Sequence, residues 1–246
     1  MNDCEVAIVM AAGLGTRMKP LTDNIPKPLI KVCGTSMIET LIHALRRRKV
    51  SCIYIVVGYM GEKFRYLEKK YDNIILVSNQ YYKMINNISS LYVVSDIMRE
   101  NNCFICEADL YITNDAVLMS NHRKSCYYGR FIKGYSDDWV FEQDENGRIM
   151  RVGKCGYNCY NMCGISYFLK HDSGVVADAI NSVWGLFGYE KLFWDDVVNQ
   201  VLDQVELEVF PVNTGDIVEI DTVDELRKFE MTQQIISPHI KEVYKS

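Results

Sequence analysis

Glycines and basic residues gather in one loop near the start of the sequence. The loop spans residues 10–29 and directly follows the apolar, β-branched run Val6–Val9, which is typical of a buried strand. Its glycines let backbone N–H groups approach phosphate oxygens, and Arg17 and Lys27 can neutralise phosphate charge. The loop lacks the P-loop pattern, and its prolines exclude the short turn into a helix that a dinucleotide fingerprint requires. We therefore predict an anion-binding loop of another kind.

Three carboxylates are candidates for a metal site. Asp109 follows the apolar run Cys103–Cys106, and the alternation of a strand places Glu219 and Asp221 on one face. Carboxylate oxygens are ligands that Mg²⁺ prefers, and Mg²⁺ commonly accompanies bound phosphates. Taken singly, these residues are better explained by structure, with Asp109 starting a turn and Asp221 or Thr222 capping the next helix.

Aromatic and acidic side chains alternate in two short segments. Trp139 follows two aspartates, and Phe193 and Trp194 are followed by Asp195 and Asp196. Each aromatic side chain taken alone is better explained by packing, but tryptophan beside carboxylates is unusual in a core. Aromatic faces and carboxylates together attract an organic cation. We expect a cationic group to bind there.

Composition excludes several classes of protein. The chain has 246 residues and a net charge of −5, which argues against nucleic acid or an anionic membrane as the main partner. Neither a secretion signal nor a long apolar span is evident, so we expect a cytoplasmic protein. Nine cysteines, an odd number, indicate free thiols. A zinc site at Cys155, Cys159 and Cys163 is less favoured than packing, because no other ligand completes the set.

Apolar runs alternate with helical patterns in the first half of the chain. The expected strands are Val6–Val9, Cys52–Val57, Ile74–Val77 and Cys103–Cys106, and the expected helices are Ser36–Lys49, Gly61–Lys70 and Asn87–Met98. This alternation predicts an α/β fold, a Rossmann-like, mainly parallel mixed sheet flanked by helices. Such sheets bind ligands at the carboxyl ends of their strands.

The pattern changes after Tyr111. The turn Asp144–Gly147 between Trp139–Gln143 and Arg148–Val152 predicts a small antiparallel flap that binds substrate. The remaining expected elements are the strands Asn161–Phe168, Leu207–Pro211 and Ile217–Ile220 and the helices Val175–Val183, Asp195–Val201 and Val223–Met231. We expect one domain over residues 1–232, with an acceptor-binding insertion at about 126–160 and a tail over 233–246.

The loop also carries a resemblance to a known family. Its sequence AAGLGTRMKPLTDNIPKPL, from Ala11 to Leu29, closely resembles the signature of nucleotidyltransferases that join a sugar or alcohol phosphate to a nucleotide. The segments INNISSLY, EADLY, FWDD and EIDTVDEL, which start at Ile85, Glu107, Phe193 and Glu219, look most like bacterial CTP:phosphocholine cytidylyltransferases. The resemblance extends from Val6 to about Phe229.

This resemblance implies a role for each candidate residue. Arg17 and Lys27 would stabilise the reacting phosphorus and the departing pyrophosphate, and Asp109 and Asp221 would hold Mg²⁺ with Glu219 as a further ligand or neighbour. Lys154 would hold the acceptor phosphate. The nucleotide would contact Ala11, Ala12, Gly13, Gly15, Thr16, Asn87, Ser90 and Glu107, although a helix cap also explains Asn87. The acceptor head group would contact Trp139, Phe193, Trp194 and Asp195.

The acceptor is expected to be phosphocholine, but two departures keep an alternative open. Phe193 and Trp194 stand where we associate a tyrosine and tryptophan pair with the resembled enzymes, and the segment around Trp139 is more acidic than a methylated ammonium requires. A primary ammonium donates hydrogen bonds, so extra carboxylates suit it better. The alternatives are 2-aminoethylphosphonate or phosphoethanolamine, and less favoured is a sugar 1-phosphate. A homodimer is also a possibility.

Overall fold

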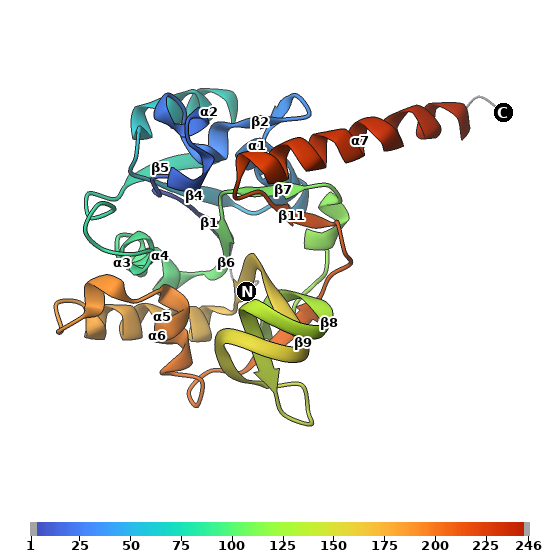
Figure 1. The fold of residues 1–246 in the computed structure, drawn as a ribbon. Helices are drawn as coiled ribbons and strands as arrows, with labels where there is room; N and C mark the ends of the chain where they lie inside the picture. Colours follow the sequence, from blue (N-terminus) through green and yellow to red (C-terminus); the bar gives the residue numbers. More distant parts are fainter. Residues whose placement is uncertain (1–3, 244–246) are drawn as a thin grey trace.

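A seven-stranded mixed sheet forms the centre of the molecule (Figure 1). The computed structural model describes the backbone of residues 4–243 and the side chains of residues 4–233. The strand order is β10-β8-β9-β6-β1-β4-β5. The strands are β1 (Glu5–Ala11), β4 (Cys52–Val57), β5 (Ile74–Ser78), β6 (Asn102–Glu107), β8 (Ser125–Gln143), β9 (Ile149–Phe168) and β10 (Leu207–Pro211).

The first half of the chain builds the parallel part of this sheet. β1 lies between β4 and β6 and pairs in parallel with both, and β5 adds to β4 in the same direction. β9 pairs antiparallel with β6 and with β8, so the sheet is mixed. The predicted α/β class is therefore confirmed, and the turns that follow β1, β4, β5 and β6 meet at one edge.

Helices cover both faces of the sheet. Alternate residues of β1 enter opposite cores, with Val9 on the face packed by α1 (Met37–Arg48) and α2 (Arg65–Lys70) and Ile8 on the other face. That second face carries α3 (Ile88–Tyr92), α4 (Ser95–Glu100), α5 (Lys170–Val183) and α6 (Trp194–Asn199). The predicted helix Asn87–Met98 is thus two short helices, and α5 begins earlier than expected.

β8 and β9 form a long, twisted hairpin that extends beyond the sheet (Figure 1). The predicted turn is present, because Asp144 N donates to Arg148 O at 2.9 Å and Gly147 N donates to Asp144 O at 3.0 Å. The hairpin is much longer than the predicted flap strands, and register shifts along it mark bulges that bend the ribbon. One long ribbon therefore serves both the sheet and the flap.

Short strands join the middle of the chain to its end. β7 (Leu110–Ile112) pairs antiparallel with β11 (Ile217–Glu219), and Ile220 N donates to Asp109 O at 3.3 Å. A second small sheet joins β2 (Lys31–Val32) to β3 (Thr35–Ser36). The β7–β11 pair brings the segment after β6 beside the segment that precedes the last helix.

The last helix, α7, runs over Val223–Val243, well beyond the predicted end at Met231. It therefore includes most of the predicted tail, of which residues 244–246 lie outside the described range. Over the described residues, the structure has no helix long and apolar enough to cross a bilayer. The domain division, the homodimer and the cytoplasmic location stay predictions.

Candidate active site

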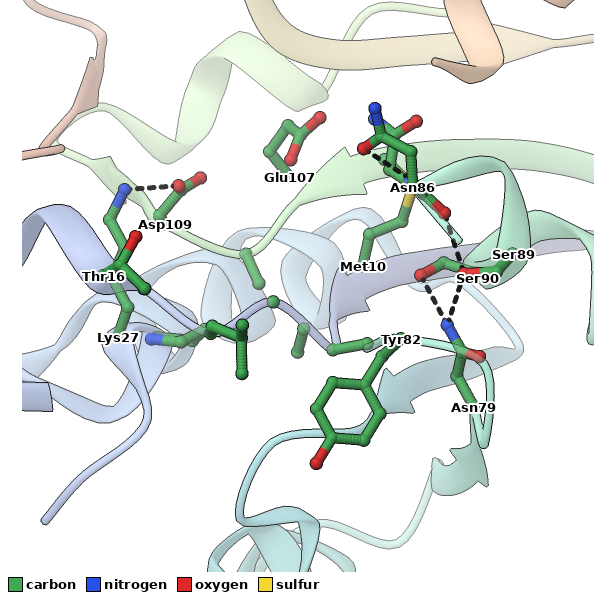
Figure 2. Close-up of a pocket in the computed structure, with 18 of the residues that line it drawn as sticks. Met10, Thr16, Lys27, Asn79, Tyr82, Asn86, Ser89, Ser90, Glu107 and Asp109 are labelled. Carbon is green, nitrogen blue, oxygen red and sulfur yellow. Dashed lines mark hydrogen bonds and ion pairs between the residues drawn. The ribbon is translucent and has the colours of Figure 1, made fainter. Parts of the chain in front are cut away.

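Two cavities meet at the edge where the strands of the parallel sheet end. The first, of about 360 Å³, lies between the loop after β1 and the start of α3 (Figure 2). The second, of about 390 Å³, lies beneath the β8–β9 hairpin and the start of α6. Both are lined by Arg17, Asn87, Glu107, Asp109 and Asp221. The carboxylates therefore stand where the contents of the two cavities would meet.

The loop after β1 has the form of a phosphate cradle. Gly15 has a positive φ of 62°, and a Cβ atom there would lie 2.9 Å from the Lys27 Cβ atom. A Cβ atom at Gly13 would meet nothing within 4 Å, so that glycine leaves open space beside the first cavity. Thr22 Oγ1 donates to Gly15 O at 2.9 Å and fixes the turn. The protein itself therefore requires glycine at Gly15, whereas the need for glycine at Gly13 stays a prediction that depends on the bound phosphate.

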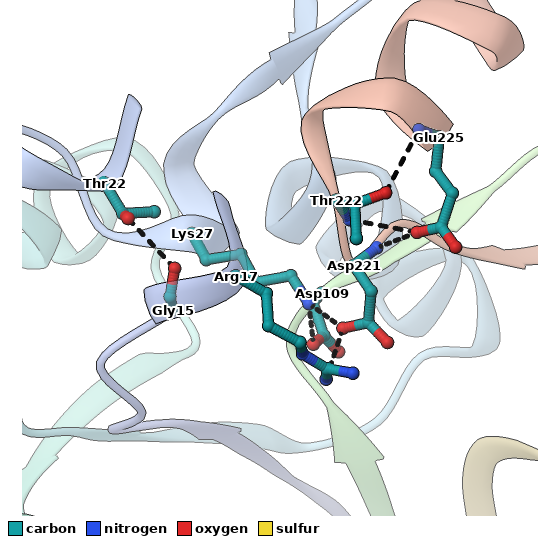
Figure 3. A network of polar contacts seen from close by, with 8 residues as sticks. All are labelled: Gly15, Arg17, Thr22, Lys27, Asp109, Asp221, Thr222 and Glu225. Atoms are coloured by element: carbon teal, nitrogen blue, oxygen red, sulfur yellow. Dashed lines mark hydrogen bonds and ion pairs between the residues drawn. The ribbon is translucent and has the colours of Figure 1, made fainter. Parts of the chain in front are cut away.

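Lys27 connects the loop to the carboxylates (Figure 3). Its Nζ atom lies 2.6 Å from Asp109 Oδ2 and also contacts Asp221 Oδ1, while Arg17 Nη2 lies 2.7 Å from that same oxygen. Burial alone would lower the pKa of Lys27, but the two carboxylates outweigh it and raise this pKa above its usual value. Lys27 is therefore a permanent cation between two acids from distant parts of the chain.

The three predicted carboxylates form one group. Asp109, Glu219 and Asp221 each offer an oxygen, and these oxygens lie within 4.8 Å of one another. Asp109 Oδ1 is buried and has no hydrogen-bond partner within the described residues. An unpartnered buried oxygen in a cluster of hard donors fits a divalent cation. Over those residues no comparable cluster includes Cys155, Cys159 and Cys163, which are free thiols like the other cysteines.

Local structure explains why Asp221 is available to this group. Thr222 Oγ1 accepts the Glu225 N–H at 3.2 Å, and Glu225 Oε2 accepts the N–H of Asp221 and of Thr222. This reciprocal cap begins α7 with Thr222 rather than Asp221. The strand β11 ends at Glu219, so Asp221 joins the cluster from the turn that follows and not from the predicted strand face.

The first cavity gathers all the predicted nucleotide-binding residues. Ala11, Ala12, Gly13, Gly15, Thr16, Asn87, Ser90 and Glu107 line it. Sequence reasoning missed Asn79, which follows β5 and donates through Nδ2 to Ser89 Oγ at 2.9 Å and Ser90 Oγ at 3.3 Å. It also missed Tyr82, which lines the cavity (Figure 2) and whose ring lies beside Gly58. Their position after parallel strands was the available signal.

Hydrogen bonds join the walls of the two cavities. Asn87 Oδ1 accepts the Trp194 N–H at 2.9 Å, and Asn86 N donates to Glu190 O at 2.9 Å. Asn87 therefore makes no side-chain cap for α3, although it holds the cap position. The start of α3 and the segment that leads into α6 are held together at the junction.

The second cavity contains most of the predicted acceptor-binding residues. Trp139 and Phe193 meet edge to face with ring centroids 5.5 Å apart, and Lys154 Nζ lies 5.6 Å and 5.9 Å from those centroids. Asp138 and Asp195 line the same cavity. Aromatic faces and carboxylates thus share one enclosure with a primary ammonium, that of Lys154.

Trp194 is placed differently from the prediction. It is only 3% exposed, stacks on Tyr127 and packs in the core with Val197 and Val198. Trp194, Val197 and Val198 are spaced three and four residues apart, so they lie on one side of α6. That side faces the core, and Trp194 is therefore buried although acidic residues follow it in the sequence. Its side chain does not line the second cavity, so it offers no face there to a head group.

Burial raises the pKa values of several carboxyl groups around the second cavity. Burial, with nearby Asp109, raises the pKa of Glu107 well above its usual range. At Glu219, desolvation and then the Asp109 and Asp221 charges raise the pKa to about 8, although this side chain is exposed at the mouth of the cavity. Burial raises the pKa of Asp195 to about 7. The cavity is thus acidic and under-neutralised, and favours a cationic ligand.

Comparison with known proteins gives a consistent result. Residues 6–127 match the family described as Nucleotidyl transferase. A 2-aminoethylphosphonate cytidylyltransferase of Lancefieldella rimae is 47% identical over 224 residues, which cover 91% of each chain. A choline-phosphate cytidylyltransferase of Streptococcus pneumoniae is 29% identical and covers 91% of this chain and 96% of its own.

A solved structure is similar over almost the whole fold. The structure, titled as a study of the catalytic mechanism of CTP:phosphocholine cytidylyltransferase from Streptococcus pneumoniae, superposes with a TM-score of 0.85 at 28% identity. The match covers 94% of this chain and 99% of that one.

Proposed function

This chain belongs to the nucleotidyl transferase family as a cytidylyltransferase, and we propose that it transfers the cytidylyl group of CTP to 2-aminoethylphosphonate and releases pyrophosphate. The observation that carries the choice of acceptor is the second cavity, in which the aromatic pair Trp139 and Phe193 lies among carboxylates. The relative at 47% identity acts on that acceptor by name, which supports the same choice.

The head group is the part of the acceptor that discriminates. A quaternary ammonium binds through aromatic faces and cannot donate a hydrogen bond, whereas a primary ammonium needs acceptors for its N–H groups. Asp138 and Asp195 line the cavity beside Trp139 and Phe193 and can accept those bonds. Asp195 is buried, so leaving its carboxylate without a further donor costs free energy, and the cavity favours the aminoethyl group.

Phosphocholine is the second candidate, and the aromatic pair favours it. Trp139 and Phe193 present faces that would suit a trimethylammonium group as well. The choline-phosphate relative is much less similar in sequence, at 29% identity. Phosphocholine was the main expectation from the sequence, and the comparisons support its alternative better.

The chain's own residues bring the two substrates together. We place the CTP triphosphate along Gly13–Arg17 and the acceptor phosphonate near Lys154, with the reacting atoms beside the cluster where both cavities meet. A phosphonate oxygen is already an anion and attacks the α-phosphorus without a general base. Pyrophosphate leaves toward Arg17 and Lys27, which neutralise its charge. Positioning and charge stabilisation supply the catalysis.

Mg²⁺ is the proposed cofactor. Asp109 and Asp221 would hold it, with Glu219 as a third ligand or as a hydrogen-bond acceptor beside it. When bound, the ion neutralises phosphate charge that the two basic residues leave uncompensated.

Four acceptors test this proposal in one experiment. Purified enzyme with CTP and Mg²⁺ is assayed for pyrophosphate release with 2-aminoethylphosphonate, its N-trimethyl analogue, phosphoethanolamine and phosphocholine. This set varies the head group and the phosphorus group independently. We expect the highest kcat/KM with 2-aminoethylphosphonate and a loss of at least tenfold on trimethylation. A preference for both trimethyl acceptors would contradict the proposed acceptor, and glucose 1-phosphate serves as the sugar control.

A further inference from the structure

Asp195 lies on the second cavity but is held from the opposite side. The residue is only 3% exposed, and its Oδ1 atom accepts the Tyr127 hydroxyl at 3.0 Å. Tyr127 comes from β8, is 1% exposed and does not line this cavity. The acid that faces the ligand is thus fixed from within the core.

The Tyr127 ring is itself immobilised by other rings. It stacks on Trp194 with centroids 5.6 Å apart and packs against Phe141 at 5.0 Å and Phe168 at 5.8 Å. The hydroxyl therefore has a fixed origin and can orient the carboxyl of Asp195 at little entropic cost. The burial of Trp194, which removes it from the cavity, contributes to this second layer.

No basic side chain within residues 4–233 forms an ion pair with Asp195. The charged groups around it are Glu107 on β6, its neighbour Asp196 on α6, and Asp138 and Lys154 on the hairpin. Acids dominate this set, and the Tyr127 hydroxyl is a neutral donor that favours the ionised form of Asp195. Full neutralisation of Asp195 awaits a cation in the cavity.

We propose that Tyr127 is a positioning residue that holds Asp195 as an anion directed at the acceptor's ammonium group. This inference rests on the proposed function for the identity of the cation. The Tyr127 hydroxyl then contributes to the selection of the acceptor, and the Tyr127 ring contributes separately to core packing. Asp195 touches the acceptor, and Tyr127 acts only through Asp195.

The test uses Tyr127→Phe, which removes the hydroxyl and keeps the ring. The matched control is Tyr167→Phe, because the Tyr167 hydroxyl is also buried and donates to a carboxylate, Glu5 Oε1, at 3.0 Å. We expect Tyr127→Phe to lower kcat/KM for 2-aminoethylphosphonate about fivefold at pH 7, through a raised KM for that acceptor, because a pKa about one unit higher reduces the ionised fraction of Asp195 from about one half to about one tenth. The KM for CTP should stay within about twofold, and the control should match the wild type in both.

The pH dependence separates positioning from packing. Losing the hydroxyl raises the pKa of Asp195 above about 7, so protonation removes the anion at neutral pH and higher pH restores it. The ratio of wild-type to variant kcat/KM should therefore shrink by pH 9, and the acceptor's own ionisation cancels in this ratio. A ratio that does not change with pH, or an equal defect in Tyr167→Phe, would overturn the inference.

A titration of the free protein distinguishes this inference from the proposed function. Carboxyl ¹³C NMR should show the Asp195 midpoint about one pH unit higher in Tyr127→Phe than in the wild type, with no acceptor present. An unchanged midpoint would refute the contact whichever acceptor the enzyme prefers. If Tyr127→Phe does not fold, the Asp195→Asn variant provides the test. If its kcat/KM still fell at low pH as in the wild type, Asp195 would not be the group that titrates, and the inference would be refuted. A failure of the proposed function would appear only as a wild-type preference for phosphocholine.

Discussion

Replacing Lys27 with methionine should make the stability of the protein depend on a divalent cation. Lys27 is nearly buried and contacts Asp109 and Asp221, whose side chains are 20% and 19% exposed. Without the ammonium, three carboxylate oxygens remain within 4.8 Å of one another. Among the described residues, Arg17 is then the only basic side chain that still forms an ion pair with this cluster.

The size of the effect follows from burial. Breaking a fully buried ion pair costs about 3–5 kcal/mol, and we reduce this to about 2–3 kcal/mol because the acids are partly exposed and Arg17 still pairs with Asp221. For a chain of this length, that loss lowers Tm by roughly 4–12 °C in EDTA. Mg²⁺ at about a hundred times its Kd returns about 2.7 kcal/mol. In the wild type Mg²⁺ must displace the ammonium and should stabilise less.

The assay is thermal denaturation in EDTA and in a series of Mg²⁺ concentrations. The matched control is Lys70→Met, since Lys70 also pairs with a carboxylate, Glu39, but its side chain is 53% exposed. We expect a small change in the control, because an exposed pair contributes less than about 1 kcal/mol. Two results would show that Lys27 and the metal do not share these carboxylates. One is a Tm of Lys27→Met in EDTA equal to that of the wild type, and the other is an equal rise in Tm with Mg²⁺ in the wild type and in Lys27→Met.

Three further predictions concern the two cavities and their junction. Asp109→Asn should lower kcat at least about a hundredfold while the circular dichroism spectrum stays native, and near wild-type turnover would exclude a catalytic metal on Asp109. Gly58→Ala should weaken CTP binding measured by calorimetry, because its Cβ atom would lie 2.6 Å from the Tyr82 ring, and unchanged affinity would show that this ring can move freely. Trp139→Ala should raise the acceptor KM with little change in Tm, because Trp139 lines the second cavity. Trp194→Ala should instead lower the free energy of unfolding by about 3–5 kcal/mol, because Trp194 is buried in the core. Kinetics and urea denaturation measure these two effects, and the reverse pattern would contradict the placement of both residues.

The strands of the parallel sheet were predictable because burial on both faces leaves continuous apolar runs such as Cys52–Val57. The β8–β9 hairpin was underestimated, since its exposed part mixes tyrosine, lysine and glycine without strict alternation. α3 and α4 were merged because Val93 and Val94 continue the apolar pattern across the break between them. Local pattern thus predicts elements that are packed on both sides better than those that bend in solvent.

The candidate site divides in a similar way. Phosphate and metal chemistry made the loop residues and the carboxylates candidates, but the pairing of Asp109 with Asp221 was expected only from the family resemblance, because each taken singly was better explained by a turn or a helix cap. Trp194 was assigned to the cavity because its acidic neighbours were weighed more heavily than its spacing from Val197. Asn79 and Tyr127 were missed, since one acts through serine hydroxyls and the other through a core contact that only the fold creates.

The pairing of β7 with β11 means that the carboxylate cluster can form only after the end of the chain has been synthesised. Asp109 emerges from the ribosome more than a hundred residues before Glu219 and Asp221, yet the three acids meet only when β11 has paired. A chain interrupted before Ile217 would still contain all seven strands of the large sheet but only one acid of the cluster. On the proposed function, a truncated chain that folds would keep the loop after β1 but would lack two of the three proposed metal ligands.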